Sequence, residues 1–319
     1  MQFETVTSLR PRRRDAALRS PDVSDDLDWI ALTRRNARSV QTLIGWIFWD
    51  PGAVSRYEEL GLNGPWGYVA ARAAPFAGAG AQSTTAAWGS ISSAVIATVF
   101  VRLATPRAFV PFWEARNAAV LDGLTQFAPE ARDALVELGP ALWSVAEQLP
   151  TVARPFFASH LELARPEHPV LVGWHAVNRL HEWRGDTHWA IVTSVGLNGA
   201  EASILHNEWL GYDDNWLSRS RGQSPDLVNA AWMSLEAKGF AAKRQILDAG
   251  LQLRQWIEDE TDRRTTTPWE LAGRDLTDLF HRRFVAPCEL LLTRVDLTAG
   301  PNYQPASRNR PPFEVPVVG

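Results

Sequence analysis

The stretch SPDLVNAAWMSLEAKGFAAKRQILDAGLQLRQWIEDETD, residues 224–262, decides the fold of the C-terminal half of the chain. It opens with Ser224, a residue that caps helices, and with Pro225 at the first helical position. The apolar residues that follow recur on one helical face: Leu227, Ala230, Ala231 and Leu235. The pattern predicts a helix that ends where Gly239 supplies a left-handed residue. A shorter helix is expected before it, over 214–220.

A short basic hairpin is expected next. Phe240 and Ile246 alternate around Lys243-Arg244, as in two short strands joined by a turn. A further helix, over 248–261, then begins at an aspartate cap. The order helix, helix, glycine turn, basic hairpin, helix is typical of a winged helix-turn-helix.

Upstream of this stretch nearly every segment has the apolar period of a helix. Between residues 26 and 155 the expected helices are 28–49, 53–60, 66–74, 83–103, 111–126, 129–138 and 141–149. After a proline-flanked junction near residue 155, the sequence predicts a long helix over 170–195 and a short helix or strand over 200–206.

The predicted fold class is mainly α: an N-terminal helical bundle plus a winged helix-turn-helix domain with a short β-wing. We expect residues 26–155 to form the helical domain and residues 156–285 to form the winged-helix domain. Residues 1–25 hold a cluster of arginines with almost no apolar period, which predicts a disordered basic tail. The proline-rich end predicts a C-terminal extended tail over 286–319.

Composition is that of a soluble globular protein, with 45% hydrophobic and 21% charged residues in a chain of 319. The net charge of -4 gives no general attraction to nucleic acid, so any DNA contact has to be local. Polar residues interrupt the weakly charged stretch 73–101, so no membrane span is expected. The single cysteine, Cys288, cannot form an internal disulfide and is expected to be buried and inert, which fits a cytoplasmic location.

Two runs resemble the MarR-type winged-helix signature: Glu236-Ala237-Lys238-Gly239-Phe240 and Ile246-Leu247-Asp248-Ala249-Gly250-Leu251. Other stretches resemble a two-domain actinobacterial family of helix-turn-helix proteins: Pro155-Phe156-Phe157-Ala158-Ser159-His160, Gly173-Trp174-His175-Ala176, Arg184-Gly185-Asp186-Thr187-His188 and Ile257-Glu258-Asp259-Glu260-Thr261-Asp262-Arg263. The resemblance covers about residues 30–285 and implies a MarR-like C-terminal domain. It departs at Leu180-His181-Glu182-Trp183, where the family pattern has Arg-Glu-His.

A DNA-reading surface needs Arg, Lys, Asn or Gln side chains that reach bases and phosphates. The candidates in the predicted winged helix are Arg219, Arg221, Asn229, Lys238, Lys243 and Arg244. Basic residues barely outnumber acidic ones in this region, so a homodimer would be needed to double them. Double-stranded DNA is therefore one expected partner, and a winged-helix scaffold with another use is the alternative.

Histidine and tryptophan are concentrated unusually in this chain. Six of the seven histidines lie between residues 160 and 206, and there are 15 tryptophans. Core packing is one explanation for the tryptophans. The other is a pocket for an unidentified small-molecule ligand, because rings and a glycine share faces of the helix over 170–195. Its candidate ligand-binding residues are Trp174, His181, Gly185, Asp186, His188 and Trp189.

The same helix also allows a purely structural interpretation, in which Arg179, Glu182 and Asp186 form a satisfied ion network. A metal site is not expected, because His181 and His188 are about 10 Å apart along the helix. Neither a Ser-His-Asp pattern nor a glycine-rich phosphate loop accompanies the histidines. The sequence therefore names no catalytic residue and no cofactor.

Two functions stay open at this point. The first is a small-molecule-responsive winged-helix (MarR-like) DNA-binding transcriptional regulator. The second is a ligand-binding protein or enzyme on a winged-helix scaffold that no longer binds DNA and uses a Trp/His-lined pocket. An exposed positive face formed by the basic candidates favours the first function, and a buried or neutral face favours the second.

Overall fold

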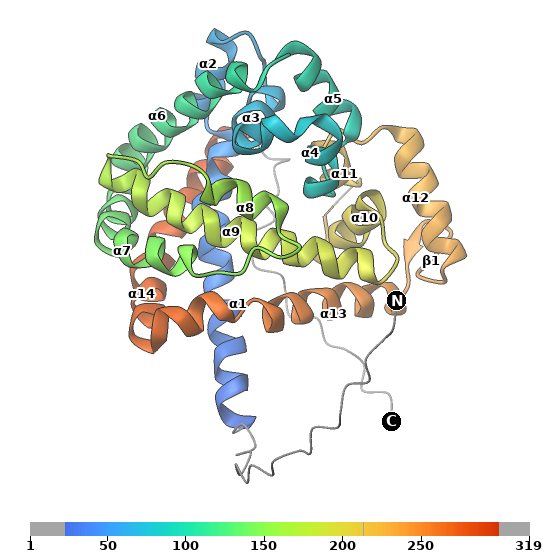
Figure 1. Cartoon of the computed structure of the whole chain (residues 1–319). Coiled ribbons are helices and arrows are strands. Elements are labelled where there is room, and N and C mark those ends of the chain that lie inside the picture. The colour runs from blue at the N-terminus through green and yellow to red at the C-terminus, as the bar shows by residue number, and fades with distance from the viewer. Residues whose placement is uncertain (1–22, 213, 300–319) are drawn as a thin grey trace, which may run out of the picture.

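The computed structural model describes residues 23–212 and 214–299, and this part of the chain is mainly α-helical, as predicted (Figure 1). The basic tail was predicted over 1–25. Its first 22 residues lie outside the described part, whereas residues 23–25 already belong to α1 (Val23–Gly45). Residues 300–319 of the predicted C-terminal tail also lie outside the described part.

The N-terminal part continues from α1 through a series of short and medium helices. In chain order these are η1 (Trp46–Trp49), α2 (Pro51–Glu59), α3 (Pro65–Ala73), η2 (Ala74–Ala79), α4 (Gly80–Trp88), α5 (Ser93–Arg102), η3 (Pro106–Phe109), α6 (Val110–Phe127), α7 (Pro129–Glu147) and α8 (Pro155–Leu161). The helix predicted over 83–103 is two helices, because Gly89 adopts a φ of 58° and ends α4. Conversely, α7 runs unbroken through Pro140.

The long helix α9 (Pro169–Ser194) crosses the middle of the molecule (Figure 1). After it come α10 (Gly199–Leu210), α11 (Trp216–Ser220), α12 (Pro225–Ala237), β1 (Ala241–Ala242), β2 (Gln245–Ile246), α13 (Asp248–Arg264) and α14 (Thr267–Ala299). The segment over 200–206 is helical because Asn198 and Glu201 form a capping box at its start. The two strands pair antiparallel between α12 and α13, where the hairpin was predicted.

The predicted extended tail is wrong for residues 286–299, which belong to α14. Phe284, Cys288 and Leu291 recur at helical spacing and are fully buried, so their apolar face holds this segment as a helix against α1 and α7. Burial raises the pKa of the Cys288 thiol to about 12, as expected for an inert cysteine.

Two hydrophobic cores share α9. The larger core takes side chains from α1 to α8, from α14 and from α9 as far as Trp183. The smaller core joins Ile191 and Val192 of α9 to α10, α12, the hairpin and α13. The boundary predicted at residue 155 falls inside the larger core, because Phe156 and Phe157 pack within it.

Two glycines fix the position of α9 against α7. A Cβ on Gly173 would lie 2.1 Å from the carbonyl oxygen of Leu135, and a Cβ on Gly139 would lie 2.7 Å from the Cα of Gly173. The two backbones are therefore in direct contact, which only glycine allows at these positions. The part of α9 beyond this crossing leads to the candidate site.

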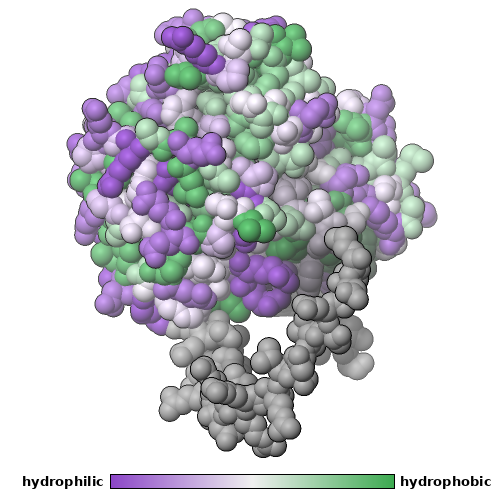
Figure 2. Space-filling model, viewed as in Figure 1, coloured by the Kyte–Doolittle hydropathy of each residue, from purple (hydrophilic) through white to green (hydrophobic). Residues whose placement is uncertain are grey.

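Hydrophilic and hydrophobic residues are interspersed over the face shown in Figure 2. Among the described helices, no single one is both long and apolar enough to cross a membrane. The segments 93–102 and 106–127 meet that criterion only as a pair, with a bend of 104° between them.

Candidate functional site

A cavity of about 310 Å³ lies between the two cores. One wall comes from α1, η1, α3 and α14, the opposite wall comes from α10, α11 and α13, and α9 contributes to both. Its volume is near the lower end of the range of about 300–1,000 Å³ that is typical of small-molecule pockets. We call this space the central cavity.

Four of the six predicted ligand-binding residues line the central cavity: His181, Gly185, His188 and Trp189. They succeed one another along the second half of α9, where the helix has left the crossing with α7. An added Cβ on Gly185 would touch nothing closer than Glu182 Oε2 at 3.7 Å, so this glycine leaves room beside the helix.

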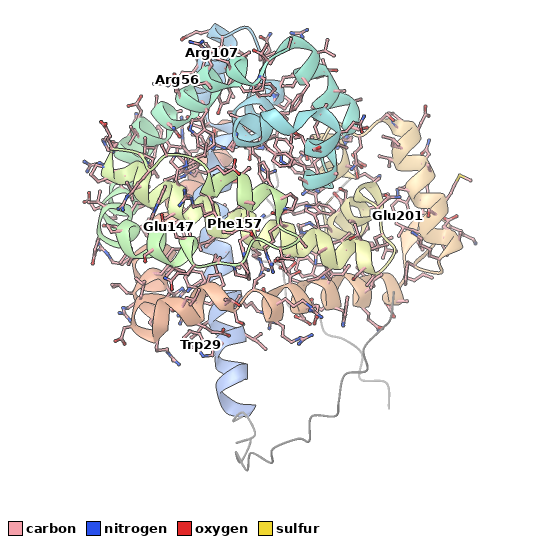
Figure 3. The ribbon with its side chains drawn as sticks, viewed as in Figure 1. Trp29, Arg56, Arg107, Glu147, Phe157 and Glu201 are labelled. Atoms are coloured by element: carbon pink, nitrogen blue, oxygen red, sulfur yellow. The ribbon has the colours of Figure 1, made fainter. Side chains whose placement is uncertain are left out.

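The other two predicted ligand-binding residues, Trp174 and Asp186, do not line the cavity. Trp174 is fully buried in the larger core, and its Nε1 donates to the carbonyl oxygen of Leu43 at 2.9 Å. Asp186 accepts a hydrogen bond of 2.8 Å from the backbone N–H of Phe157, which Figure 3 labels on α8. Both side chains therefore hold helices together.

The ion network within α9 does not form as predicted. Glu182 instead accepts two hydrogen bonds from Arg72 of α3, at 2.7 and 3.2 Å. Arg179 stacks on Trp143, with its guanidinium carbon 3.5 Å from the ring centroid. The intrahelical spacing was correct for a salt bridge, but partners on neighbouring helices supply better geometry for these buried charges.

The wall of the cavity formed by α13 carries a shared carboxylate. Glu258 accepts from Arg184 of α9 at 2.8 Å and from Arg254, one turn earlier on α13, at 2.7 Å. Burial opposes ionisation, but the charges of the two arginines hold the pKa of Glu258 well below its usual range. Both carboxylate oxygens are thus occupied by guanidinium groups.

Three histidines line the cavity, and all three are neutral near pH 7. Burial, followed by the charge of Arg254, lowers the pKa of His188 to about 3 and that of His206 well below its usual value. Burial also lowers the pKa of His181. Neutral imidazoles offer a ligand both donor and acceptor nitrogens.

The wall formed by α1, η1, α3 and α14 is largely apolar and aromatic. Its residues include Val40, Ile44, Trp46, Phe48, Trp49, Tyr68, Leu292 and Val295. Large rings and aliphatic side chains of this kind favour a flat organic ligand, because they bury its surface without polar competition. Gln41, Thr42 and Arg72 also line this side, and Leu205, Leu217 and Ile257 line the other, so both sides of the central cavity combine polar and apolar groups.

The described residues contain no group of three or more His, Cys, Asp or Glu side chains that could hold a metal ion.

The six predicted DNA-binding residues do not share one exposed face. Arg221 lines the central cavity and donates to Ser203 Oγ at 3.3 Å. Lys238 Nζ donates to Glu201 at 2.6 Å, so its charge is neutralised at α10, where Figure 3 labels Glu201. Lys238 and the remaining four are exposed, and among them Asn229 accepts a hydrogen bond from the Arg244 guanidinium.

The turn between β1 and β2 has an unusual sequence for its geometry. Lys243 and Arg244 adopt φ values of 50° and 59°. Positive φ at both central residues is the pattern of a type I′ turn, which strongly prefers Asn-Gly. Two long, exposed cationic side chains therefore occupy backbone positions that are strained for residues other than glycine.

The order of elements from α10 to α13, with a basic hairpin beside α12, defines the class of protein as a helix-turn-helix protein with an internal cavity. The chain belongs to the Helix-turn-helix family, whose model matches residues 33–295. This membership supports a DNA-binding role of the regulatory kind. Comparisons with curated proteins and with solved structures gave no match.

Several cavity residues were not predicted, above all Arg254 and Glu258 of α13 and Ser203 of α10. The i,i+4 spacing of Arg254 and Glu258 signals an ion pair, but it does not show that α13 faces α9. His206 belonged to the histidine cluster and could have been included on that ground. Nothing in the sequence of α1 indicated that Val40, Gln41 and Ile44 line a cavity.

Proposed function

We propose that this protein is a small-molecule-responsive helix-turn-helix regulator of transcription that acts in the cytoplasm. The observation that carries the proposal is the position of the central cavity, whose opposite walls come from elements of the two cores. A ligand there contacts both parts of the molecule. It can shift their arrangement to the extent that it binds one arrangement more tightly.

Contacts beside the cavity supply a route to the DNA-binding elements. The backbone oxygen of Arg221 accepts from Ser92 N at 3.0 Å, and the amide nitrogen of Gln223 donates to the oxygen of Ser90 at 3.0 Å. The connection from α11 to α12 is thus bonded to the segment between α4 and α5. Ser90 and Ile91 of that segment line the cavity, so a ligand that displaces them acts on the connection that leads into α12.

On the DNA side, the proposal assigns Arg219, Lys243 and Arg244 to phosphate contacts in a MarR-like mode. Three cations in one copy are few, because a salt-sensitive binder typically neutralises about 6–10 phosphates. We infer that two copies bind together, so that the cationic surface is doubled.

The experiment is a fluorescence anisotropy titration of labelled DNA from upstream of the protein's own gene, at about 50 and about 200 mM salt. We expect binding that weakens steeply with salt and that Lys243→Gln weakens further. Arg132→Gln, which neutralises a partly exposed arginine on α7, is the matched control. Absence of binding near 50 mM salt overturns the regulator.

One observation favours a second candidate, a ligand-binding protein that does not bind DNA. The helix α12 contains no Lys or Arg, and its exposed side chains include Met233 and Leu227, which are 71% and 47% exposed. Such a helix offers little to base edges. The same titration separates the two candidates, because only the regulator predicts binding.

A further inference from the structure

Arg254 lines the central cavity, and one nitrogen of its guanidinium has no partner among the described residues. Its side chain is 4% exposed, and its Nη2 donates to Glu258 at 2.7 Å. Its Nη1 is buried and has no hydrogen-bond partner within the described residues. An unsatisfied buried donor on a charged group is costly, so an acceptor from outside the chain would stabilise it.

The surroundings of Arg254 indicate what kind of acceptor fits. Glu258 does not supply it, because its two oxygens accept from Arg184 and from Arg254 Nη2 and neither accepts from Nη1. Arg221 lines the same cavity, so a second guanidinium belongs to this wall. Two guanidinium groups favour a carboxylate, which accepts charge-assisted hydrogen bonds.

His188 adds a requirement for a donor on the ligand. The Thr261 hydroxyl donates to the oxygen of Ile257 at 2.6 Å, so towards His188 Nδ1, 3.0 Å away, it acts as an acceptor. The proton of the neutral imidazole therefore lies on Nδ1. Its Nε2 carries a lone pair that accepts a hydrogen bond, and Thr261 does not line the cavity whereas His188 does.

The wall formed by α1, η1, α3 and α14 determines which kind of ring system the ligand can have. Phe48, Ile44 and Val295 belong to it, together with the aromatic and aliphatic residues named above. A rigid ring placed against this wall buries one apolar face there, while its polar groups reach α9 and α13.

We propose that the central cavity binds an aromatic hydroxy acid, whose carboxylate is held by Arg254 and whose hydroxyl donates to His188 Nε2. This inference rests on the proposed ligand-binding function. It adds the chemical class of the ligand and its orientation, with the acid towards α13 and the ring towards α1.

Three probes of equal shape test the proposal: 6-hydroxy-2-naphthoate, the neutral 6-hydroxy-2-naphthamide, and 2-naphthoate without the hydroxyl. Binding to the full chain is followed by energy transfer from tryptophan. We expect the hydroxy acid to bind about 10-fold or more tightly than the amide, and several-fold more tightly than 2-naphthoate.

Substitutions identify the residue that causes each preference between the probes. Arg254→Gln should remove the preference for the acid over the amide, and His188→Phe should remove the preference for the hydroxyl, while Arg132→Gln leaves both preferences unchanged. The ratio of the affinities for two probes is compared within each variant. A partly destabilised variant therefore still shows whether the preference between the probes is kept.

The outcomes separate the two claims. Equal affinities for acid and amide in the unaltered protein overturn the anion site and leave the cavity as a ligand site. Binding of the acid that survives unchanged in Arg254→Gln also overturns it. Failure of all three probes at millimolar concentration overturns the aromatic hydroxy acid, whereas the ligand-binding function is tested separately by native mass spectrometry of protein from its own host.

Discussion

Arg72 of α3 and Glu182 of α9 form a two-point ion pair in the interior, with Nη2 to Oε2 at 2.7 Å and Nε to Oε1 at 3.2 Å. The Glu182 side chain is 2% exposed. Arg72 also lies over the ring of Trp88, 4.6 Å from its centroid. This pair joins the N-terminal helices to the part of α9 that lines the central cavity.

Breaking the pair should destabilise the fold. Glu182→Gln leaves the Arg72 guanidinium buried without its counter-charge, so we expect the free energy of unfolding to fall by about 3 kcal/mol. Urea denaturation measures it, with the exposed Glu270→Gln as control. An unchanged unfolding midpoint would show that the pair contributes nothing.

Asp186 should make stability depend on pH. Burial, together with the charge of Glu182, raises the pKa of Asp186 to about 7, although the hydrogen bond from Phe157 N acts in the opposite direction. The folded state therefore holds this proton more tightly than the unfolded state does, and stability is lost as the pH rises from about 4 to about 7.

The variant Asp186→Asn stays neutral and avoids this loss. Relative to the unaltered protein, it should gain about 2 to 3 kcal/mol between pH 5 and pH 8. Urea unfolding at both pH values measures the gain, and Asp275→Asn on the exposed face of α14 is the control. A difference that is the same at both pH values would mean that Asp186 is ionised throughout.

The contact between α7 and α9 allows a clear steric test. In Gly173→Ala the new methyl group meets Leu135 O, so we expect a loss of about 3 kcal/mol or more in the free energy of unfolding. Gly45→Ala is the matched control, since nothing lies within 4 Å of its added Cβ. Equal stability of the two variants would mean that the helices separate at no cost.

We expect that a substitution suited to the β1–β2 turn raises the stability of the protein and weakens its binding to DNA. Replacing Lys243-Arg244 by Asn-Gly suits the type I′ geometry and should stabilise the protein by about 1 kcal/mol. The same change removes two exposed cations and should weaken DNA binding. Unchanged DNA affinity in this double variant, together with higher stability, would exclude a role for the turn in DNA contact.

Much of the fold is predictable from the chain. The cap at Ser224, the glycine after α12 and the alternation around Lys243-Arg244 act locally, so the order α12, hairpin, α13 follows from neighbouring residues. The end of α14 was missed because proline beyond residue 300 suggested an extended tail. Its helix is held by packing against α1 and α7, which are distant in sequence.

The site was predictable only in part, for the same reason. The face of α9 with His181, Gly185 and His188 was visible as a periodic pattern, and it lines the cavity. The partners of that face come from helices far along the chain. Arg254 therefore could not be recognised as a cavity residue, and Arg221 was assigned to DNA although it points inward to Ser203.

Native mass spectrometry of protein purified from its own host tests the central claim most directly, by comparing the unaltered chain with Gly185→Leu. The leucine side chain enters the cavity from α9, where the glycine has free space. We predict that the unaltered protein carries a small additional mass, released on denaturation, and that the variant folds normally without it. The same additional mass on both proteins, or on neither, would contradict a ligand in the central cavity.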